Sequence, residues 1–203
     1  MRKIPTVFAR DPQDRAHVLP EINPDCQWVI DGEGTATRKY DGTCVMLDDD
    51  GRWWARREVK PGKTPPPNYR PVSTDPATGK TVGWEPAEQS AFAKFFRQAL
   101  DFKRSGFSKT PPGTYELLGP KINGNPERRR HHELIAHRFA EQSFGATYFG
   151  NRTFDAIQEE VLRLAEHGWE GIVYHHPDGR MAKIKARDFA PAPAAAPEGD
   201  NRG

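Results

Sequence analysis

Residues 35–42 read Thr35-Ala36-Thr37-Arg38-Lys39-Tyr40-Asp41-Gly42, a strand-like alternation that ends in charged side chains. Because side chains on a strand alternate between its faces, Lys39 and Asp41 are expected on one face and Tyr40 on the other. Gly42 lets the backbone turn or approach a ligand closely. A Lys-x-Asp-Gly match is equally typical of an exposed strand end, so its interpretation as a site depends on partners elsewhere in the chain.

Charged residues also interrupt three later apolar segments. In Lys183-Ile184-Lys185 the same alternation puts both ammonium groups on one face, which indicates either an anion between them or a solvated edge strand. Glu116 and Glu170 lie within short apolar strand patterns, where a carboxylate is costly unless it is paired, hydrogen-bonded or bound to a metal. Ion pairs with arginines are the structural alternative for both carboxylates.

The remaining periodicity predicts an α+β fold. A long surface loop is expected at 60–86, because this stretch is rich in Pro, Gly, Thr and Asn. Helices are expected over 88–104 and from an N-cap at Thr153 to Gly168. Further strands are expected at 114–119 and 133–139, and hairpins at 44–56 and 169–185.

Composition limits the class of protein. The 203 residues carry 30 basic and 28 acidic side chains, a net charge of +2, so any phosphate-binding surface must be a local cluster. Two cysteines provide no disulfide framework and no zinc-ligand spacing, and no apolar run reaches membrane-spanning length. We therefore expect a soluble, cytoplasmic, monomeric protein with no membrane partner. It should form one domain at 1–189, followed by a disordered Pro/Ala-rich tail at 190–203.

Taken together and in order, these motifs resemble those of the covalent nucleotidyltransferases, which include DNA ligases, RNA ligases and mRNA-capping enzymes. Within that superfamily the chain looks like the small RNA ligases related to the vertebrate 5′-3′ RNA ligase, over residues 7–189. The motifs that carry the resemblance are Lys39-Tyr40-Asp41-Gly42-Thr43-Cys44, Trp54-Ala55-Arg56, the run from Glu116 to Pro126, Glu170-Gly171-Ile172-Val173 and Lys183-Ile184-Lys185.

The resemblance implies an adenylation domain of two antiparallel sheets packed against each other, with helices outside and the nucleotide in the cleft between them. DNA ligases and capping enzymes usually carry an OB-fold domain after the Lys-x-Lys motif. Fewer than twenty residues follow that motif here, so no OB-fold domain is expected. The implied activity is ATP-dependent RNA ligation, in which AMP passes from ATP to Lys39 and then to a 5′-phosphate, before a 3′-hydroxyl seals the strand.

Roles for the other residues also follow from the resemblance. Asp41 and Glu170 would serve Mg²⁺, with Mn²⁺ as an alternative, Glu116 would bind the ribose, and Arg56 the sugar or a phosphate. Lys183 and Lys185 would neutralise the α-phosphate. Ile135 and His137, together with Phe139, are candidates to stack on adenine. Contacts to the phosphates of RNA are expected from basic and polar residues near the motifs, namely Lys60, Lys121, Asn123, Arg128 and Arg129.

Two other functions stay open at the level of sequence. A DNA or nick-sealing polynucleotide ligase would carry the same motifs. A nucleotide- or RNA-binding module without turnover could keep the same fold, although a pure binder has no need for a strand-borne lysine nucleophile.

Overall fold

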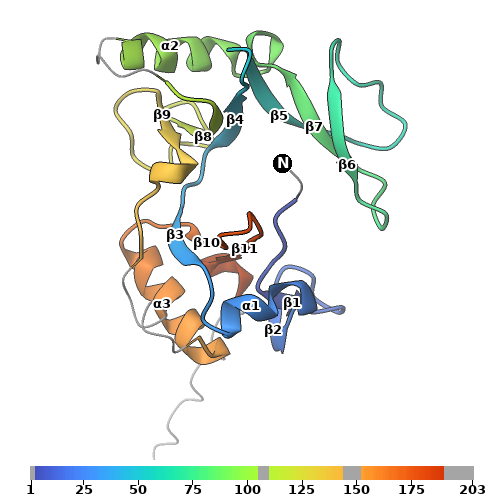
Figure 1. Cartoon of the computed structure of the whole chain (residues 1–203), viewed down its shortest axis with the longest axis vertical. Helices are drawn as coiled ribbons and strands as arrows, with labels where there is room; N and C mark the ends of the chain where they lie inside the picture. Colours follow the sequence, from blue (N-terminus) through green and yellow to red (C-terminus); the bar gives the residue numbers. More distant parts are fainter. Residues whose placement is uncertain (1–2, 105–109, 144–151, 190–203) are drawn as a thin grey trace, which may run out of the picture.

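The computed structural model describes residues 3–104, 110–143 and 152–189. The two larger β-sheets lie one above the other along the long axis, and the chain between β3 (Thr35–Lys39) and β4 (Thr43–Leu47) connects them (Figure 1). The N-terminal segment runs into the space between the two sheets. The predicted combination of helices with antiparallel sheets is confirmed.

The larger sheet has the strand order β6-β7-β5-β4-β8-β9, and all its ladders are antiparallel. Helix α2 (Ala93–Arg104) contacts β9 and buries Phe96 and Ala99 beneath it. The strands of this sheet after β4 are β5 (Trp53–Val59), β6 (Arg70–Thr74), β7 (Thr81–Pro86), β8 (Gly113–Leu118) and β9 (Glu133–Ala136).

The smaller sheet has the order β11-β10-β3 and joins residues far apart in the sequence. Strand β10 lies in the middle and pairs antiparallel with both neighbours, and helix α3 contacts it. A two-stranded sheet of β1 and β2 packs with the three-stranded sheet, and together they form what we call the smaller half of the molecule. The remaining elements of this half are β1 (Phe8–Arg10), β2 (Val18–Ile22), α1 (Gln27–Ile30), α3 (Phe154–Glu166), β10 (Gly171–His175) and β11 (Met181–Lys185).

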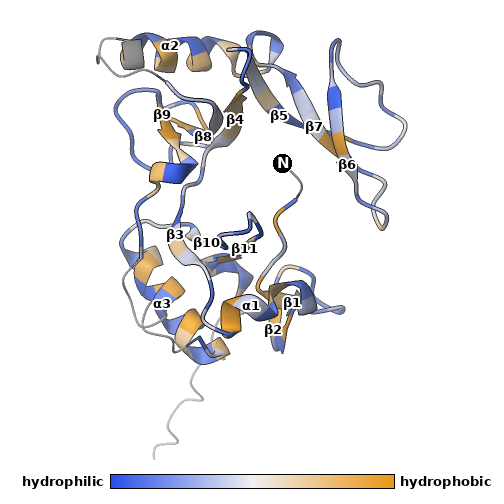
Figure 2. Ribbon diagram, viewed as in Figure 1, coloured by the Kyte–Doolittle hydropathy of each residue, from blue (hydrophilic) through white to orange (hydrophobic). Residues whose placement is uncertain are grey.

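Each half has its own hydrophobic core, as the separate apolar regions in Figure 2 illustrate. Ile157, Ile172 and Ile184 are among the buried residues of the smaller half, whereas Val45 and Leu117 belong to the core of the larger half. The expectation that the two sheets pack against each other is therefore wrong. Their buried apolar residues form two separate clusters, and a cavity lies between the sheets.

The expected loop at 60–86 is also corrected, because it contains β6 and β7. Strand β7 pairs with β5 along six positions, with Trp84 opposite Arg56, and β6 forms the exposed edge. The glycines and prolines of this stretch masked its strand periodicity, and pairing with β5 supplied the order that local propensity lacked.

Most other expected elements are confirmed, with shifts at their ends. Thr153 caps α3 by accepting a hydrogen bond from the Ala156 backbone nitrogen at 3.3 Å. Helix α2 begins at Ala93, later than expected, because a 3₁₀ turn occupies Ala87–Gln89. Strand β9 ends at Ala136, and His137–Phe139 form a 3₁₀ turn. The tail at 190–203 lies outside the described residues.

Within the described ranges, no helix has the length and apolar character needed to cross a membrane.

Replacement of Gly171 by alanine tests how closely the three strands of the smaller sheet pack. A Cβ on Gly171 would lie 2.1 Å from the Ile184 carbonyl oxygen and 2.7 Å from the Lys185 Cα, so the strands would have to separate. We expect Gly171→Ala to lower the free energy of unfolding by about 3 kcal/mol or more, measured by denaturant titration.

Gly32→Ala is the matched control. Gly32 has a positive φ of 87° but open space around its Cβ position, so its replacement should cost only about 1–2 kcal/mol. Equal losses in the two variants would contradict the close approach at Gly171.

Candidate active site

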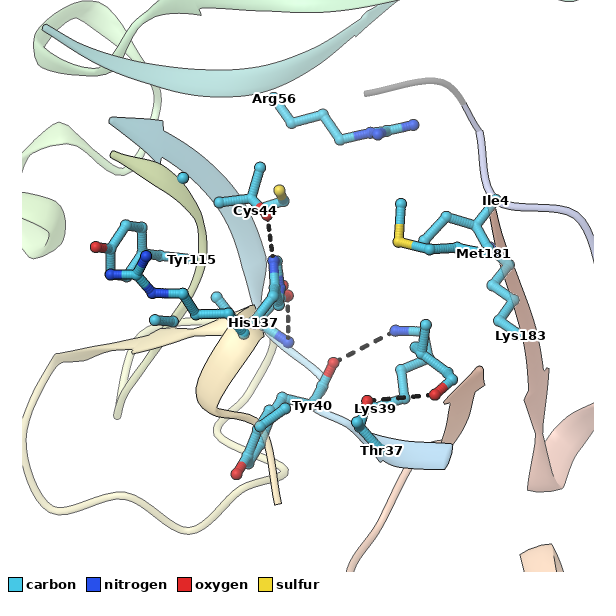
Figure 3. A pocket seen from close by; sticks show the side chains of 18 of the residues that line it. Ile4, Thr37, Lys39, Tyr40, Cys44, Arg56, Tyr115, His137, Met181 and Lys183 are labelled. Carbon is cyan, nitrogen blue, oxygen red and sulfur yellow. Dashed lines mark hydrogen bonds and ion pairs between the residues drawn. The ribbon is translucent and has the colours of Figure 1, made fainter. Parts of the chain in front are cut away.

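A cavity of about 650 Å³ lies between the two sheets, and it brings together five residues predicted from separate motifs. Its lining includes Lys39 from β3, Arg56 from β5, Glu116 from β8, His137 from the turn after β9 and Lys183 from β11. Figure 3 shows Lys39 and Lys183 on the side of the smaller sheet, Cys44 and His137 on the opposite wall, and Arg56 reaching in from the larger sheet.

The register of the smaller sheet explains how the lysines come together. Gly171 of β10 pairs with Lys39 on one side and Lys185 on the other, so these two lysines share a row across the sheet. Lys183 lies two rows along, opposite Val173, and Ile184 in the row between the two lysines is fully buried. The predicted alternation of Lys183-Ile184-Lys185 is confirmed, with one apolar side chain in the core between two half-buried ammonium groups.

Glu170 is the counter-ion of this row. Its Oε2 accepts a hydrogen bond from Lys39 Nζ at 2.5 Å, its Oε1 pairs with Lys185 Nζ, and Arg187 Nη2 lies 3.5 Å from the same Oε1. Burial by itself would raise the pKa of Glu170, but the charges and hydrogen bonds of Lys39 and Lys185 outweigh it and lower the pKa. The carboxylate is therefore ionised at neutral pH and holds three cations around it.

Lys183 has a different environment. Burial first, and then the neighbouring ammonium groups of Lys185 and Lys39, lower the pKa of Lys183 to about 8. At neutral pH most molecules still carry this charge, so Lys183 can neutralise a phosphate.

The turn after Lys39 is fixed by a close contact with β8. A Cβ on Gly42 would lie 2.4 Å from the Leu117 carbonyl oxygen and 2.8 Å from Glu116 Cγ, so a larger residue could not occupy this place. The Gly42 backbone nitrogen donates to Glu116 Oε1 at 3.1 Å. The glycine thus brings the motif against the carboxylate of another motif.

Asp41 is turned away from the expected place. The prediction that it shares a strand face with Lys39 is wrong, because β3 ends at Lys39 and the chain bends at Asp41. Its Oδ1 accepts a hydrogen bond from Asn123 Nδ2 at 3.0 Å, and it is not part of the cavity lining. Asn123 also donates to the Gly42 carbonyl oxygen at 2.8 Å, so this residue supports the turn.

Glu127 was not anticipated as part of the site. Its side chain is 2% exposed, its Oε2 accepts from Arg38 Nη2 at 2.6 Å, and its Oε1 accepts from the Asp41 backbone nitrogen at 2.9 Å. A carboxylate in the polar, arginine-rich run at 127–130 looks like a solvated charge in sequence. Its burial follows only from the fold, which presses this loop against the motif turn.

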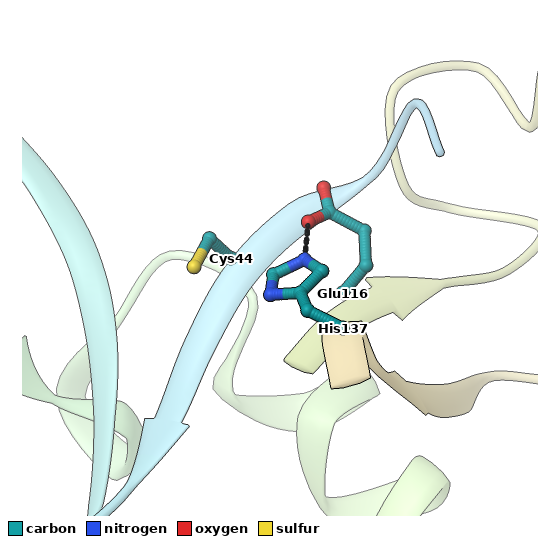
Figure 4. Close-up of side chains that lie close together, drawn as sticks. All are labelled: Cys44, Glu116 and His137. Atoms are coloured by element: carbon teal, nitrogen blue, oxygen red, sulfur yellow. Dashed lines mark hydrogen bonds and ion pairs between the residues drawn. The ribbon is translucent and has the colours of Figure 1, made fainter. Parts of the chain in front are cut away.

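Glu116 is held in a chain of hydrogen bonds on the wall of the cavity. Its Oε2 and His137 Nε2 lie 2.9 Å apart, and His137 Nδ1 lies 2.9 Å from Thr114 Oγ1. Cys44 lies beside this chain, as Figure 4 shows. Burial, and then the Glu116 carboxylate, raise the pKa of the Cys44 thiol to about 12, so the thiol stays protonated.

A group of potential metal ligands lies on the wall of the cavity. In the described part of the chain, the one group of three close candidates is Cys44, Glu116 and His137, whose ligand atoms lie within 4.8 Å of one another. Both ring nitrogens of His137 are already hydrogen-bonded, and the thiol is protonated. Mg²⁺ commonly takes one or two carboxylates together with substrate phosphates. Glu170 is a carboxylate of that kind beside Lys39, but Lys39, Lys185 and Arg187 already engage its oxygens, and neither Glu170 nor Asp41 lines the cavity.

The other predicted nucleotide and RNA contacts are dispersed. Ile135 is half-buried opposite Glu116 in the β8–β9 ladder but does not line the cavity, whereas His137 does. Arg129 is held by Glu133, with Nε 3.3 Å from Oε1. Lys121 and Arg128 are exposed on the loop after β8, and Lys60 lies at a separate cavity of about 550 Å³ beside β5 and β6.

No protein-family model matches this chain, and a search of curated proteins finds no match.

The buried position of Glu127 leads to a prediction about stability. Glu127→Ala removes the more deeply buried of the two carboxylates that pair with Arg38, and it removes the hydrogen-bond acceptor of the Asp41 backbone nitrogen. We expect a loss of about 3 kcal/mol in the free energy of unfolding, measured by denaturant titration. Glu159→Ala, at an exposed position on α3, is the control and should change stability by no more than about 0.5 kcal/mol. Similar small losses in both would show that Glu127 is not a support of the motif.

A second prediction concerns Lys183. Its pKa of about 8 lies below its ordinary value of 10.5, so the charged form is disfavoured in the folded state and costs stability below about pH 8. Lys183→Met should therefore raise the free energy of unfolding at pH 7 by about 1–3 kcal/mol. The gain should shrink as the pH rises from 8 toward 10.5, because the folded wild type then sheds the charge. A constant gain over this range would rule out the lowered pKa as its cause.

Proposed function

We propose that this chain is an ATP-dependent RNA ligase that carries AMP on Lys39. One observation supports the proposal above all: Lys39, Arg56, Glu116 and Lys183 line one cavity, although up to 144 positions separate them in the sequence. Their chemistry matches the parts of a nucleoside triphosphate, with cations for phosphate oxygens and a fixed carboxylate for a sugar hydroxyl.

The size of the cavity agrees with this substrate. Pockets for small molecules and cofactors commonly enclose about 300–1,000 Å³, and this one encloses about 650 Å³. Its walls include apolar surface from Ile4, Val173 and Met181, against which a base could lie. Glu116 is held at both oxygens, by Gly42 and His137, so it presents a preorganised acceptor rather than a mobile side chain.

The first reaction is a displacement at phosphorus. The Lys39 Nζ lone pair forms a bond to the α-phosphorus of ATP, the bond from that phosphorus to the α,β-bridging oxygen breaks, and pyrophosphate leaves with the electron pair. The nitrogen loses its proton, and the product is a lysyl-AMP phosphoramidate. Lys183 and Lys185 lie beside Lys39 and oppose the negative charge that develops on the phosphate.

Glu170 holds the nucleophile before reaction. Its Oε2 accepts a hydrogen bond from Lys39 Nζ at 2.5 Å, and attack on phosphorus requires a nitrogen that is free of this contact and of its proton. Lys39 can therefore attack only after its hydrogen bond to Glu170 is broken and its nitrogen has lost a proton. Mg²⁺ bound at Glu170 and the triphosphate would supply neutralisation of phosphate charge.

Two further displacements complete ligation. An oxygen of the RNA 5′-phosphate attacks the phosphorus of lysyl-AMP, which returns the electron pair to Lys39 and leaves AMP on the RNA end. The 3′-hydroxyl of the second end then attacks the 5′-phosphate phosphorus, loses its proton, and expels AMP. Exposed Lys121 and Arg128 lie on the loop that supports the motif turn, where they are available to contact RNA phosphates.

Incubation with α-labelled ATP and Mg²⁺, followed by denaturing separation, tests the proposal. We expect acid-labile label on the wild-type chain, no label on Lys39→Ala, and wild-type labelling of Lys94→Ala, a control at an exposed position on α2. Lys39→Ala should keep the fold, because Lys185 still pairs with Glu170. Label should then pass to 5′-phosphorylated RNA in preference to DNA of the same sequence.

Three results would count against the proposal. Absence of label on wild-type protein not already adenylylated would favour a binding module. Label mapped to Lys183, the cavity lysine with the lowered pKa, would overturn the choice of nucleophile. Transfer to DNA ends alone would replace the RNA ligase by a DNA ligase.

A further inference from the structure

A second, strongly basic groove adjoins the cavity on the far side of β11. It encloses about 530 Å³, and Lys183 lines both spaces. One acidic residue, Asp188, also lines the groove, and its Oδ1 already accepts from Arg10 Nη2 at 2.7 Å. The basic residues that line it are Lys3, Arg10, Arg15, Lys183, Lys185 and Arg187.

Backbone pairing fixes the groove to the cavity. The Lys183 backbone nitrogen donates to the Pro5 carbonyl oxygen at 2.9 Å, and the Val7 nitrogen donates to the Lys183 carbonyl oxygen at 2.9 Å. Thr6 thus forms a parallel bridge with Lys183 and extends the smaller sheet beyond β11. The N-terminal segment therefore forms one wall of the groove, and its backbone hydrogen bonds to Lys183 fix its position.

The groove has more positive charge than its own carboxylates balance. Arg10 is engaged by Asp188, Lys185 and Arg187 lie at Glu170, and Lys3 lies 3.4 Å from Asp75. Among the described residues, no carboxylate oxygen lies within 4 Å of a side-chain nitrogen of Lys183 or Arg15. A small, highly charged anion fits this excess better than a neutral ligand does.

The direction of the reaction indicates which anion this is. In a displacement at phosphorus the attacking and leaving atoms lie roughly in line on opposite sides. Lys39 is on β3, at one edge of the strand order β3-β10-β11, and the groove lies beyond the other edge. A leaving group opposite Lys39 therefore points across β10 and β11 toward the groove.

We infer that this groove binds the β- and γ-phosphates of the nucleoside triphosphate and the pyrophosphate that leaves. The inference rests on the proposed function, because the in-line argument takes Lys39 as the nucleophile. Lys183 then lies at the junction between the α-phosphate and the pyrophosphate, and Arg15 supplies an exposed guanidinium that can bind phosphate oxygens in a bidentate manner.

Arg15→Ala tests the inference through two measurements with inorganic pyrophosphate. The first is equilibrium binding by calorimetry, in the full chain carrying Lys39→Ala so that no covalent AMP interferes. The second is the reverse of the first step, in which pyrophosphate at subsaturating concentration attacks lysyl-AMP of the adenylylated chain, with Lys39 intact, and releases the AMP group as ATP. We expect pyrophosphate affinity and release each to fall by about tenfold, with partial recovery in Arg15→Lys. Arg97→Ala, at an exposed position on α2, should match its parent.

Sealing of pre-adenylylated RNA separates the groove from an RNA site, because that step involves no pyrophosphate. Unchanged pyrophosphate affinity in Arg15→Ala would overturn the inference, and a loss confined to RNA sealing would assign the groove to the RNA backbone instead. The two proposals can fail separately. If the wild-type chain never forms lysyl-AMP but pyrophosphate binding still depends on Arg15, the groove is supported and the proposed ligase is refuted.

Discussion

The carboxylate of Glu170 is the interaction on which the rest of the site depends. Strand pairing puts Lys39 and Lys185 in one row on either side of Gly171, with Lys183 two rows away, and the mutual repulsion of these lysines would oppose that register. Glu170 lies where the strand begins and holds Lys39 and Lys185 directly. One carboxylate therefore allows the sheet to form with its cations together, and leaves Lys183 with a charge that burial disfavours.

The second constraint is the short link between the halves of the molecule. Residues 40–42 carry the chain from β3 to β4, and their bend is held by Asn123, Glu127 and Glu116 from the larger half. Because the halves have separate cores, these polar contacts position Lys39 relative to the opposite wall of the cavity. Hydrogen bonds at the bend, rather than a shared apolar core, thus set the geometry between the two halves.

Local patterns predicted the elements of the fold better than their arrangement. Periodicity identified α3 with its Thr153 cap, the C-terminal hairpin and the faces of Lys183 and Ile184, because these depend on near neighbours. Strands β6 and β7 were missed because their order comes from tertiary pairing, of β7 with β5 and of β6 with β7. Asp41 was misplaced and Glu127 was missed for a related reason. Contacts with distant segments decide where β3 ends and what buries a polar loop.

The order of elements along the chain has a consequence for biosynthesis. The larger half is one continuous stretch from β4 to β9, so it can fold as soon as it leaves the ribosome. The smaller half needs β3 to pair with β10, more than a hundred residues later, and such distant pairing closes slowly. Until β10 and β11 are synthesised, Lys39 has no counter-ion and no neighbouring lysines. The nascent chain therefore acquires its reactive centre last, after the larger half has formed around an incomplete cavity.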